Sequence, residues 1–143
     1  ALELGLSLHQ YGLSTLVMEG DLRNRGLSRL VGLQTSQLPW QSSLDRYQGL
    51  ALAGLPHDFR APQDIILDPM LRDWMVRQHR DFSVILVDTP PLSQVSDALL
   101  WARLCPASLW VSRNRKFRGI PEGNFCEDLR DAGSEVWGIV ICD

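Results

Sequence analysis

The chain has 143 residues, of which 45% are hydrophobic and 22% charged, and its formal net charge is −3. This length suits one globular domain with a real core, and the composition is ordinary for a soluble protein. The negative charge disfavours a nucleic-acid-binding protein, which usually presents a basic face, and no segment approaches the ~18 apolar residues of a membrane span. We therefore expect a single domain over residues 1–143 and no nucleic-acid partner.

The three cysteines, Cys105, Cys126 and Cys142, show no CxxC spacing and have no paired histidines beside them. An odd number of cysteines without such a framework is typical of a reducing compartment and disfavours a structural zinc site. No signal peptide is visible. We therefore expect this part of the protein to be cytoplasmic.

Helical and strand patterns alternate along the first half of the chain. Residues 1–10 predict a helix that ends at Tyr11-Gly12, since glycine is favoured just past a helix end. Residues 13–18 predict a strand, 26–33 one or two short helical turns, 35–46 a surface segment, and 49–54 a short edge strand. The first helix is apolar on most of its circumference and has no capping residue, so we expect more chain before Ala1.

The second half continues the alternation. Pro62 predicts a short helix over 63–67, and Asp68 followed by Pro69 predicts an N-capped helix to about Arg80. The remaining expected elements are a strand at 82–87, a helix at 96–104, a strand at 108–111, a helix at 122–132 and a strand at 136–142. This order predicts βαβ units, and hence an α/β fold with a mostly parallel β-sheet flanked by helices.

The most informative segment is residues 84–91, which read Val-Ile-Leu-Val-Asp-Thr-Pro-Pro. Four apolar residues before an acid and a turn predict a strand buried on both faces, as in parallel sheets. Ligands of open α/β sheets bind at the carboxyl ends of strands, where a carboxylate can hold Mg²⁺ through water. The simpler alternative is that Asp88 only caps a loop, but the apolar run, the acid and the prolines together favour a site.

A second copy of this pattern lies at residues 16–23. Glu19 and Asp21 follow a strand, and Arg23 can pair with Asp21 or reach a phosphate. By itself such a pattern is more often a surface ion pair. Beside Asp88, it predicts that two carboxylates meet at one sheet edge and bind a metal–phosphate ligand.

Taken in order, these segments resemble the bacterial tyrosine kinases of polysaccharide export, within the deviant-Walker (MinD/ParA-like) branch of the P-loop NTPases. The resemblance spans essentially the whole chain and implies a nucleotide-binding α/β domain with ATP and Mg²⁺ as cofactors. The residues that carry it are Glu19 to Arg23, Leu55-Pro56, Pro62, Met70, Val84 to Pro91, Asp97-Ala98 and Trp137 to Val140.

The resemblance also implies roles for individual residues. Asp21 belongs to the family's Walker A′ element and Asp88 to its Walker B element, so both would be catalytic residues that arrange Mg²⁺. Asp21 would also be the base that activates a tyrosine hydroxyl. Glu19, Arg23 and Pro90 would help to bind the cofactor, although Glu19 stands where the family usually has the shorter Asp.

The sequence departs from the family in two further respects. It contains no Gly-x-x-x-x-Gly-Lys-Ser/Thr loop, which in the family precedes the helix that residues 1–10 resemble, so the P-loop and the first strand of the sheet are lacking. It has no tyrosine cluster, only Tyr11 and Tyr47. Either this is part of a longer polypeptide that carries the loop, or it is a degenerate relative that does not bind ATP; the helix at its start favours the first explanation.

The leading hypothesis is an ATP-dependent tyrosine autokinase domain that regulates the chain length and export of an exopolysaccharide or capsule. Its partners would be a transmembrane polysaccharide co-polymerase or activator, fused or separate, and neighbouring copies of itself in a homo-oligomer at the inner face of the plasma membrane. One alternative is a MinD/ParA-like partition or positioning ATPase, supported only by the basic run over residues 113–118. Another is a non-catalytic pseudo-kinase partner of an export complex.

Overall fold

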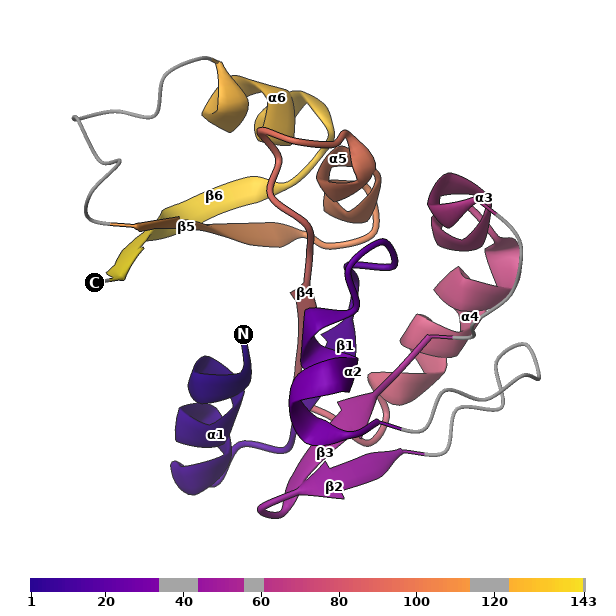
Figure 1. The fold of residues 1–143 in the computed structure, drawn as a ribbon, viewed down its shortest axis with the longest axis vertical. Coiled ribbons are helices and arrows are strands. Elements are labelled where there is room, and N and C mark those ends of the chain that lie inside the picture. Colours follow the sequence, from indigo (N-terminus) through magenta and orange to yellow (C-terminus); the bar gives the residue numbers. More distant parts are fainter. Residues whose placement is uncertain (34–43, 56–60, 114–123, 143) are drawn as a thin grey trace. The chain divides into compact units, whose positions relative to one another are not determined.

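The computed structural model describes residues 1–33, 44–55, 61–113 and 124–142 (Figure 1). The chain forms two compact units, residues 1–90 and 91–143. Each unit combines parallel strands with helices, which confirms the predicted α/β fold with a mainly parallel sheet. Across the described ranges, none of the helices is long and apolar enough to cross a bilayer.

The first unit is built on a four-stranded sheet with the order β2-β3-β1-β4. Its strands are β1 (Thr15–Glu19), β2 (Asp45–Tyr47), β3 (Leu50–Ala53) and β4 (Val84–Asp88). β1 pairs in parallel with both β3 and β4, and β2 pairs antiparallel with β3. All five residues of β1 are buried, because this strand is central and both of its faces are covered.

Four helices flank this sheet: α1 (Leu2–Gln10), α2 (Gly26–Val31), α3 (Pro62–Ile66) and α4 (Pro69–Gln78). Figure 1 shows α1 and α2 on one side of the strands and α3 and α4 on the other. Val17, Leu50 and Leu52 form the core beneath α1 and α2, together with Leu27 of α2. Because successive side chains of a strand point to opposite faces, Glu19 lies on the same face of β1 as Val17.

Local signals fixed the helix ends as predicted. The Asp68 carboxylate accepts a hydrogen bond from the Met70 N–H at 2.9 Å, and Pro69 occupies the first position of α4. Gly12 follows α1 with a φ of +86°, a left-handed conformation that glycine adopts without strain.

Two strand predictions were wrong in detail. β4 was expected to be buried on both faces, but all five of its residues are half-buried. In the described part of the first unit, β4 is the end strand of its sheet, with β1 as its one neighbour. The predicted edge strand, β3, instead lies between β2 and β1, because residues 45–47 of the predicted surface segment form β2; residues 35–43 of that segment lie outside the described ranges.

The second unit contains the parallel strands β5 (Ala107–Arg113) and β6 (Glu135–Cys142) and the helices α5 (Asp97–Ala102) and α6 (Phe125–Asp131). The Trp110 ring of β5 stacks on Phe125 of α6 with 5.2 Å between the ring centroids. Trp101 of α5 is almost fully buried. This unit therefore has its own small aromatic core, in the element order predicted from the sequence.

Candidate functional site

The acids of the two predicted motifs lie at the same edge of the first sheet. Glu19, the last residue of β1, is the register partner of Asp88, the last residue of β4. The Gly20 N–H donates a hydrogen bond to the Asp88 carbonyl oxygen at 2.8 Å, which joins the segment after β1 to the end of β4. In-register residues of parallel strands share a face, so both carboxylates lie on the side that α1 and α2 cover.

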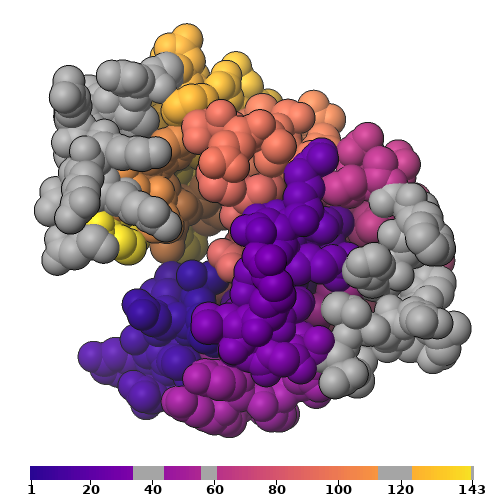
Figure 2. Space-filling model, in the orientation of Figure 1, coloured from indigo at the N-terminus to yellow at the C-terminus, as the bar shows by residue number. Residues whose placement is uncertain are grey.

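Asp21 lies in the turn between β1 and α2. Its Oδ1 accepts the backbone N–H groups of Arg23, at 3.2 Å, and Asn24, at 2.9 Å. Such self-bonded turns are a common role of aspartate, and here they fix the carboxylate relative to its own backbone. Figure 2 shows the segment that contains this turn and α2 at the surface of the first unit.

Asp88 is half-buried, and its ionisation is perturbed. Burial raises the pKa of its carboxyl above the usual range, and the negative charge of Asp21 raises it as well. The hydrogen bond between Gly20 and Asp88 brings the Asp21 turn beside the end of β4, and Gly5 of α1 packs on Val17, so the start of α1 lies toward the same edge. The N–H groups at a helix start carry partial positive charge, so this edge combines two acids with a site favourable to anions.

Glu19 is fully buried. Its Oε2 accepts the Ser28 N–H at 2.7 Å, whereas its Oε1 and the Ser28 hydroxyl have no hydrogen-bond partner among the described residues. Burial raises the pKa of Glu19; the hydrogen bond from the Ser28 backbone N–H lowers it, and the negative charges of Asp88 and Asp21 raise it. The carboxylate that was expected to bind a cofactor thus faces the backbone of α2.

The other two predicted binding residues lie nearby. Arg23 is exposed in the same turn as Asp21. Pro90 follows β4 by two residues and is buried. Glu19, Asp21, Arg23, Asp88 and Pro90 thus lie at or just past the ends of β1 and β4 in the first unit, and their chemical roles stay predictions.

Sequence reasoning missed two residues of this region. Arg25 is the N-cap of α2, with a left-handed φ of +46°, and its Nη1 donates to the Leu55 carbonyl oxygen at 3.0 Å. Ser28 supplies the N–H that Glu19 accepts. The nearest signal was the second arginine after Asp21, whereas nothing in the sequence marks a contact between residues 19 and 28.

The donor set fits a magnesium–nucleotide complex better than a metal caged by protein. No three His, Cys, Asp or Glu side chains in the described ranges are grouped to hold a metal ion. Mg²⁺, however, is usually held by one or two carboxylates and completes its shell with waters and substrate phosphates. Of the acids at this edge, Asp21 and Asp88 would be the carboxylates for such a complex.

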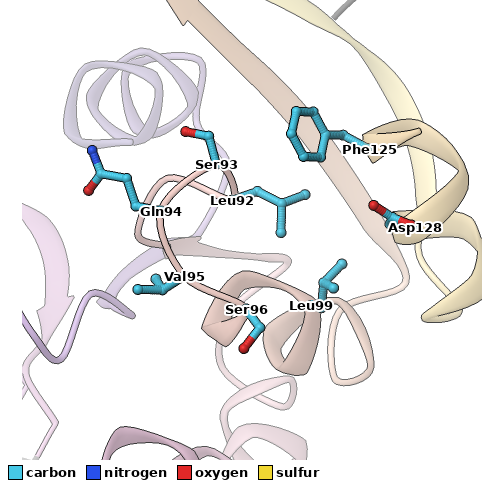
Figure 3. Close-up of a pocket in the computed structure, with 8 residues that line it drawn as sticks. All are labelled: Leu92, Ser93, Gln94, Val95, Ser96, Leu99, Phe125 and Asp128. Atoms are coloured by element: carbon cyan, nitrogen blue, oxygen red, sulfur yellow. The ribbon is translucent and has the colours of Figure 1, made fainter. Parts of the chain in front are cut away.

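A separate hollow of about 230 Å³ lies within the second unit (Figure 3). Leu92, Leu99 and Phe125 point toward one another across it, and Asp128 lies at its side. The loop residues Ser93 to Ser96 complete the lining. It contains none of the predicted site residues.

No protein-family model matches the chain, and no curated protein sequence matches it. Several solved structures do. The kinase domain of VpsO aligns with a TM-score of 0.80 and 22% identity over 98% of this chain and 74% of that one. The kinase domain of the Escherichia coli tyrosine kinase ETK aligns with a TM-score of 0.79 and 18% identity over 96% of this chain and 58% of that one.

A third similar structure is cobyrinic acid a,c-diamide synthase from Mycobacterium smegmatis, with a bound ATP analogue and magnesium. It aligns with a TM-score of 0.76 and 16% identity over 98% of this chain and 66% of that one. At such low identities the likeness is one of fold. The chain therefore shares its mainly parallel α/β fold with the kinase domains of VpsO and ETK and with this synthase.

Proposed function

We propose that this chain belongs to an ATP-dependent protein-tyrosine kinase that phosphorylates itself. The observation that carries the proposal is that β1 and β4 end side by side in register, which brings Asp88 next to the turn that holds Asp21. The fold supports it, because bacterial tyrosine kinase domains share this fold.

Asp21 and Asp88 are the residues that would hold Mg²⁺, and the bound ion would neutralise negative charge on the nucleotide phosphates. In the reaction, the tyrosine oxygen attacks the γ-phosphorus, the bond to the β-phosphate oxygen breaks, and ADP leaves. Asp21 would accept the hydroxyl proton. Its two hydrogen bonds from Arg23 and Asn24 keep the carboxylate in place for that step, so the main contributions are positioning and charge.

Negative charge at this edge needs compensation, since Asp21 and Asp88 would stand beside a polyanionic nucleotide. Arg23 is exposed in the turn, and a guanidinium binds phosphate oxygens in pairs. The start of α1 adds the partial positive charge of its N–H groups. These groups support phosphate binding at the same edge as the acids.

The wider biological role rests on the sequence resemblance to the polysaccharide-export kinases. We propose regulation of exopolysaccharide or capsule chain length and export at the inner face of the plasma membrane. The partners would be a transmembrane co-polymerase or activator and neighbouring copies of the same protein.

The test uses the full-length protein with Mg²⁺ and ATP, followed by detection of phosphotyrosine. Wild type should become labelled, and Asp88→Asn should lose most of the label, because the substitution removes one of the two metal-binding carboxylates. Asp73→Asn is the matched control, since Asp73 is exposed on α4. Equal labelling of wild type and Asp88→Asn would refute the kinase proposal.

The two alternatives make different predictions. For the partition ATPase, the supporting basic run lies outside the described residues beyond Arg113, so no structural observation favours it. For the pseudo-kinase, calorimetry of the full-length protein would show no nucleotide binding. Nucleotide binding with tyrosine labelling would exclude both.

A further inference from the structure

We propose that Glu19 is a positioning residue that holds the Asp21 turn in shape through α2 and does not itself bind the nucleotide complex. This inference rests on the proposed function only for its effect on nucleotide affinity. The structural part concerns the hydrogen bond from the Ser28 N–H to Glu19 Oε2, which is 2.7 Å long and buried.

The bond supplies what α2 otherwise lacks. The first N–H groups of a helix have no partner within the helix and are usually capped by a side chain. At the N-cap of α2, Arg25 makes no side-chain capping bond. Glu19 reaches across from the end of β1 and caps Ser28, the third residue of the helix, by a short charge-assisted bond.

With this bond, the turn that carries Asp21 is fastened at both ends. At its start, the Gly20 N–H donates to the Asp88 carbonyl oxygen at 2.8 Å. Within it, the Arg25 N–H donates to the Asp21 carbonyl oxygen, also at 2.8 Å. At its end, Glu19 fixes α2 to the tip of β1, so Asp21 lies in a closed loop of hydrogen bonds from strand to helix.

The length of the side chain matters for this function. The Ser28 nitrogen and Glu19 Oε2 are only 2.7 Å apart, and the Glu19 side chain is completely buried between β1 and α2. An aspartate is one methylene shorter and would leave the Ser28 N–H without its acceptor unless α2 moved. A glutamine has the same length and an amide oxygen that accepts the same bond.

A rival explanation is that Glu19 acts through its charge. Its Oε1 has no partner among the described residues and lies beside Asp21 and Asp88, so it could serve the metal directly. Two substitutions distinguish the explanations. Glutamine keeps the hydrogen bond and removes the charge, whereas aspartate keeps the charge but is too short to make the hydrogen bond.

The experiment compares Glu19→Gln, Glu19→Asp and Asp88→Asn in the full-length protein. Hydrogen exchange of the peptide over residues 20–30 reports the turn, and titration calorimetry with Mg²⁺–ADP reports affinity. Glu19→Gln should keep wild-type exchange and an affinity within about threefold of wild type, because a neutral acceptor replaces the charged one. Glu19→Asp should exchange at least about tenfold faster over this peptide and bind at least about tenfold more weakly.

Ser28→Ala is the control, since it keeps the backbone N–H and should change neither exchange nor affinity. If Glu19→Gln loses as much affinity as Asp88→Asn while its exchange stays slow, Glu19 acts through its charge and the proposal is wrong. It is also wrong if Glu19→Asp exchanges faster but binds as wild type does. Should Glu19→Asp fail to fold, the comparison of Glu19→Gln with Asp88→Asn still decides.

The outcome for the proposed function is separate. If the wild-type protein binds no Mg²⁺–ADP, the kinase proposal fails, and exchange alone tests the fastening of the turn. Faster hydrogen exchange in Glu19→Asp than in Glu19→Gln would then support the proposal that Glu19 holds the Asp21 turn. Equal exchange in the two variants would overturn that proposal.

Discussion

Gly5 of α1 packs directly on the central strand of the first unit, which makes it a sensitive test of the core. A Cβ added at Gly5 would overlap Val17 Cγ2 and would come within 3.1 Å of Leu50 Cδ2. Val17 and Leu50 have no exposed surface, so neither side chain can give way by turning out into solvent. We therefore predict that Gly5→Ala destabilises the protein, although alanine favours helix.

The magnitude follows from two opposing effects. Replacing glycine by alanine inside a helix gains about 1 kcal/mol. Forcing an extra methyl group into a well-packed core costs about 1–3 kcal/mol, and the upper half of that range applies because Val17 is β-branched and stiff. The net free energy of unfolding should fall by about 1–2 kcal/mol, measured by urea denaturation with an unchanged slope.

Two companion variants show whether the contact with Val17 is the cause. Gly26→Ala is the matched control, because nothing lies within 4 Å of a Cβ there, so it should not destabilise. In a Val17→Ala background the clash is removed, and Gly5→Ala should become stabilising by up to about 1 kcal/mol. Stabilisation by Gly5→Ala in the wild-type background, equal to that by Gly26→Ala, would refute the close packing of α1 on β1.

Three further predictions concern a helix cap, an acid and a thiol. Asp68→Ala should lower the free energy of unfolding by about 1 kcal/mol, since α4 loses its capping bond, and no change in a urea titration would contradict this. Burial is the main effect that raises the pKa of Asp88, so the folded protein holds the carboxyl proton more tightly than the unfolded chain does. The free energy of unfolding of wild type should therefore fall as the pH rises through the unfolded pKa and then the folded pKa of this carboxyl. Asp88→Asn has no such proton and should not show this fall. Denaturation from about pH 4 to 8 measures the gap between the two proteins, and a gap independent of pH would exclude the effect. Burial raises the pKa of Cys105 to about 11, so iodoacetamide at pH 8 should alkylate the exposed Cys142 much faster than Cys105, and equal rates by mass spectrometry would contradict this.

The parts of the fold that depend on local chemistry were predictable from the sequence. Asp68-Pro69 marked the start of α4, and Tyr11-Gly12 marked the end of α1, because capping involves neighbours along the chain. The apolar runs before Glu19 and Asp88 likewise marked two strand ends. Since parallel strands of one sheet share an edge, the meeting of these acids followed from two local patterns and one topological rule.

The parts that depend on distant partners were not predictable. β2 has three residues, two of them charged, and is a strand only because β3 offers a pairing edge. The half-burial of β4 reflects its place at the end of the described sheet, which its own apolar run does not encode. The contact between Glu19 and Ser28 was not predictable either, because it joins the end of β1 to α2, and only the folded structure brings those elements together.

The most direct test of the account is whether Asp21 and Asp88 hold the same ion. Mn²⁺ can replace Mg²⁺ in the full-length protein with ADP, and electron paramagnetic resonance measures how much of the ion is bound. We predict that Asp21→Asn and Asp88→Asn each weaken Mn²⁺ binding at least about tenfold. In the double variant, the fold-loss of affinity should be larger than in either single variant but smaller than the product of the two single losses, because both residues hold the same ion. Unchanged Mn²⁺ binding in either single variant would contradict a shared metal at this edge of the sheet.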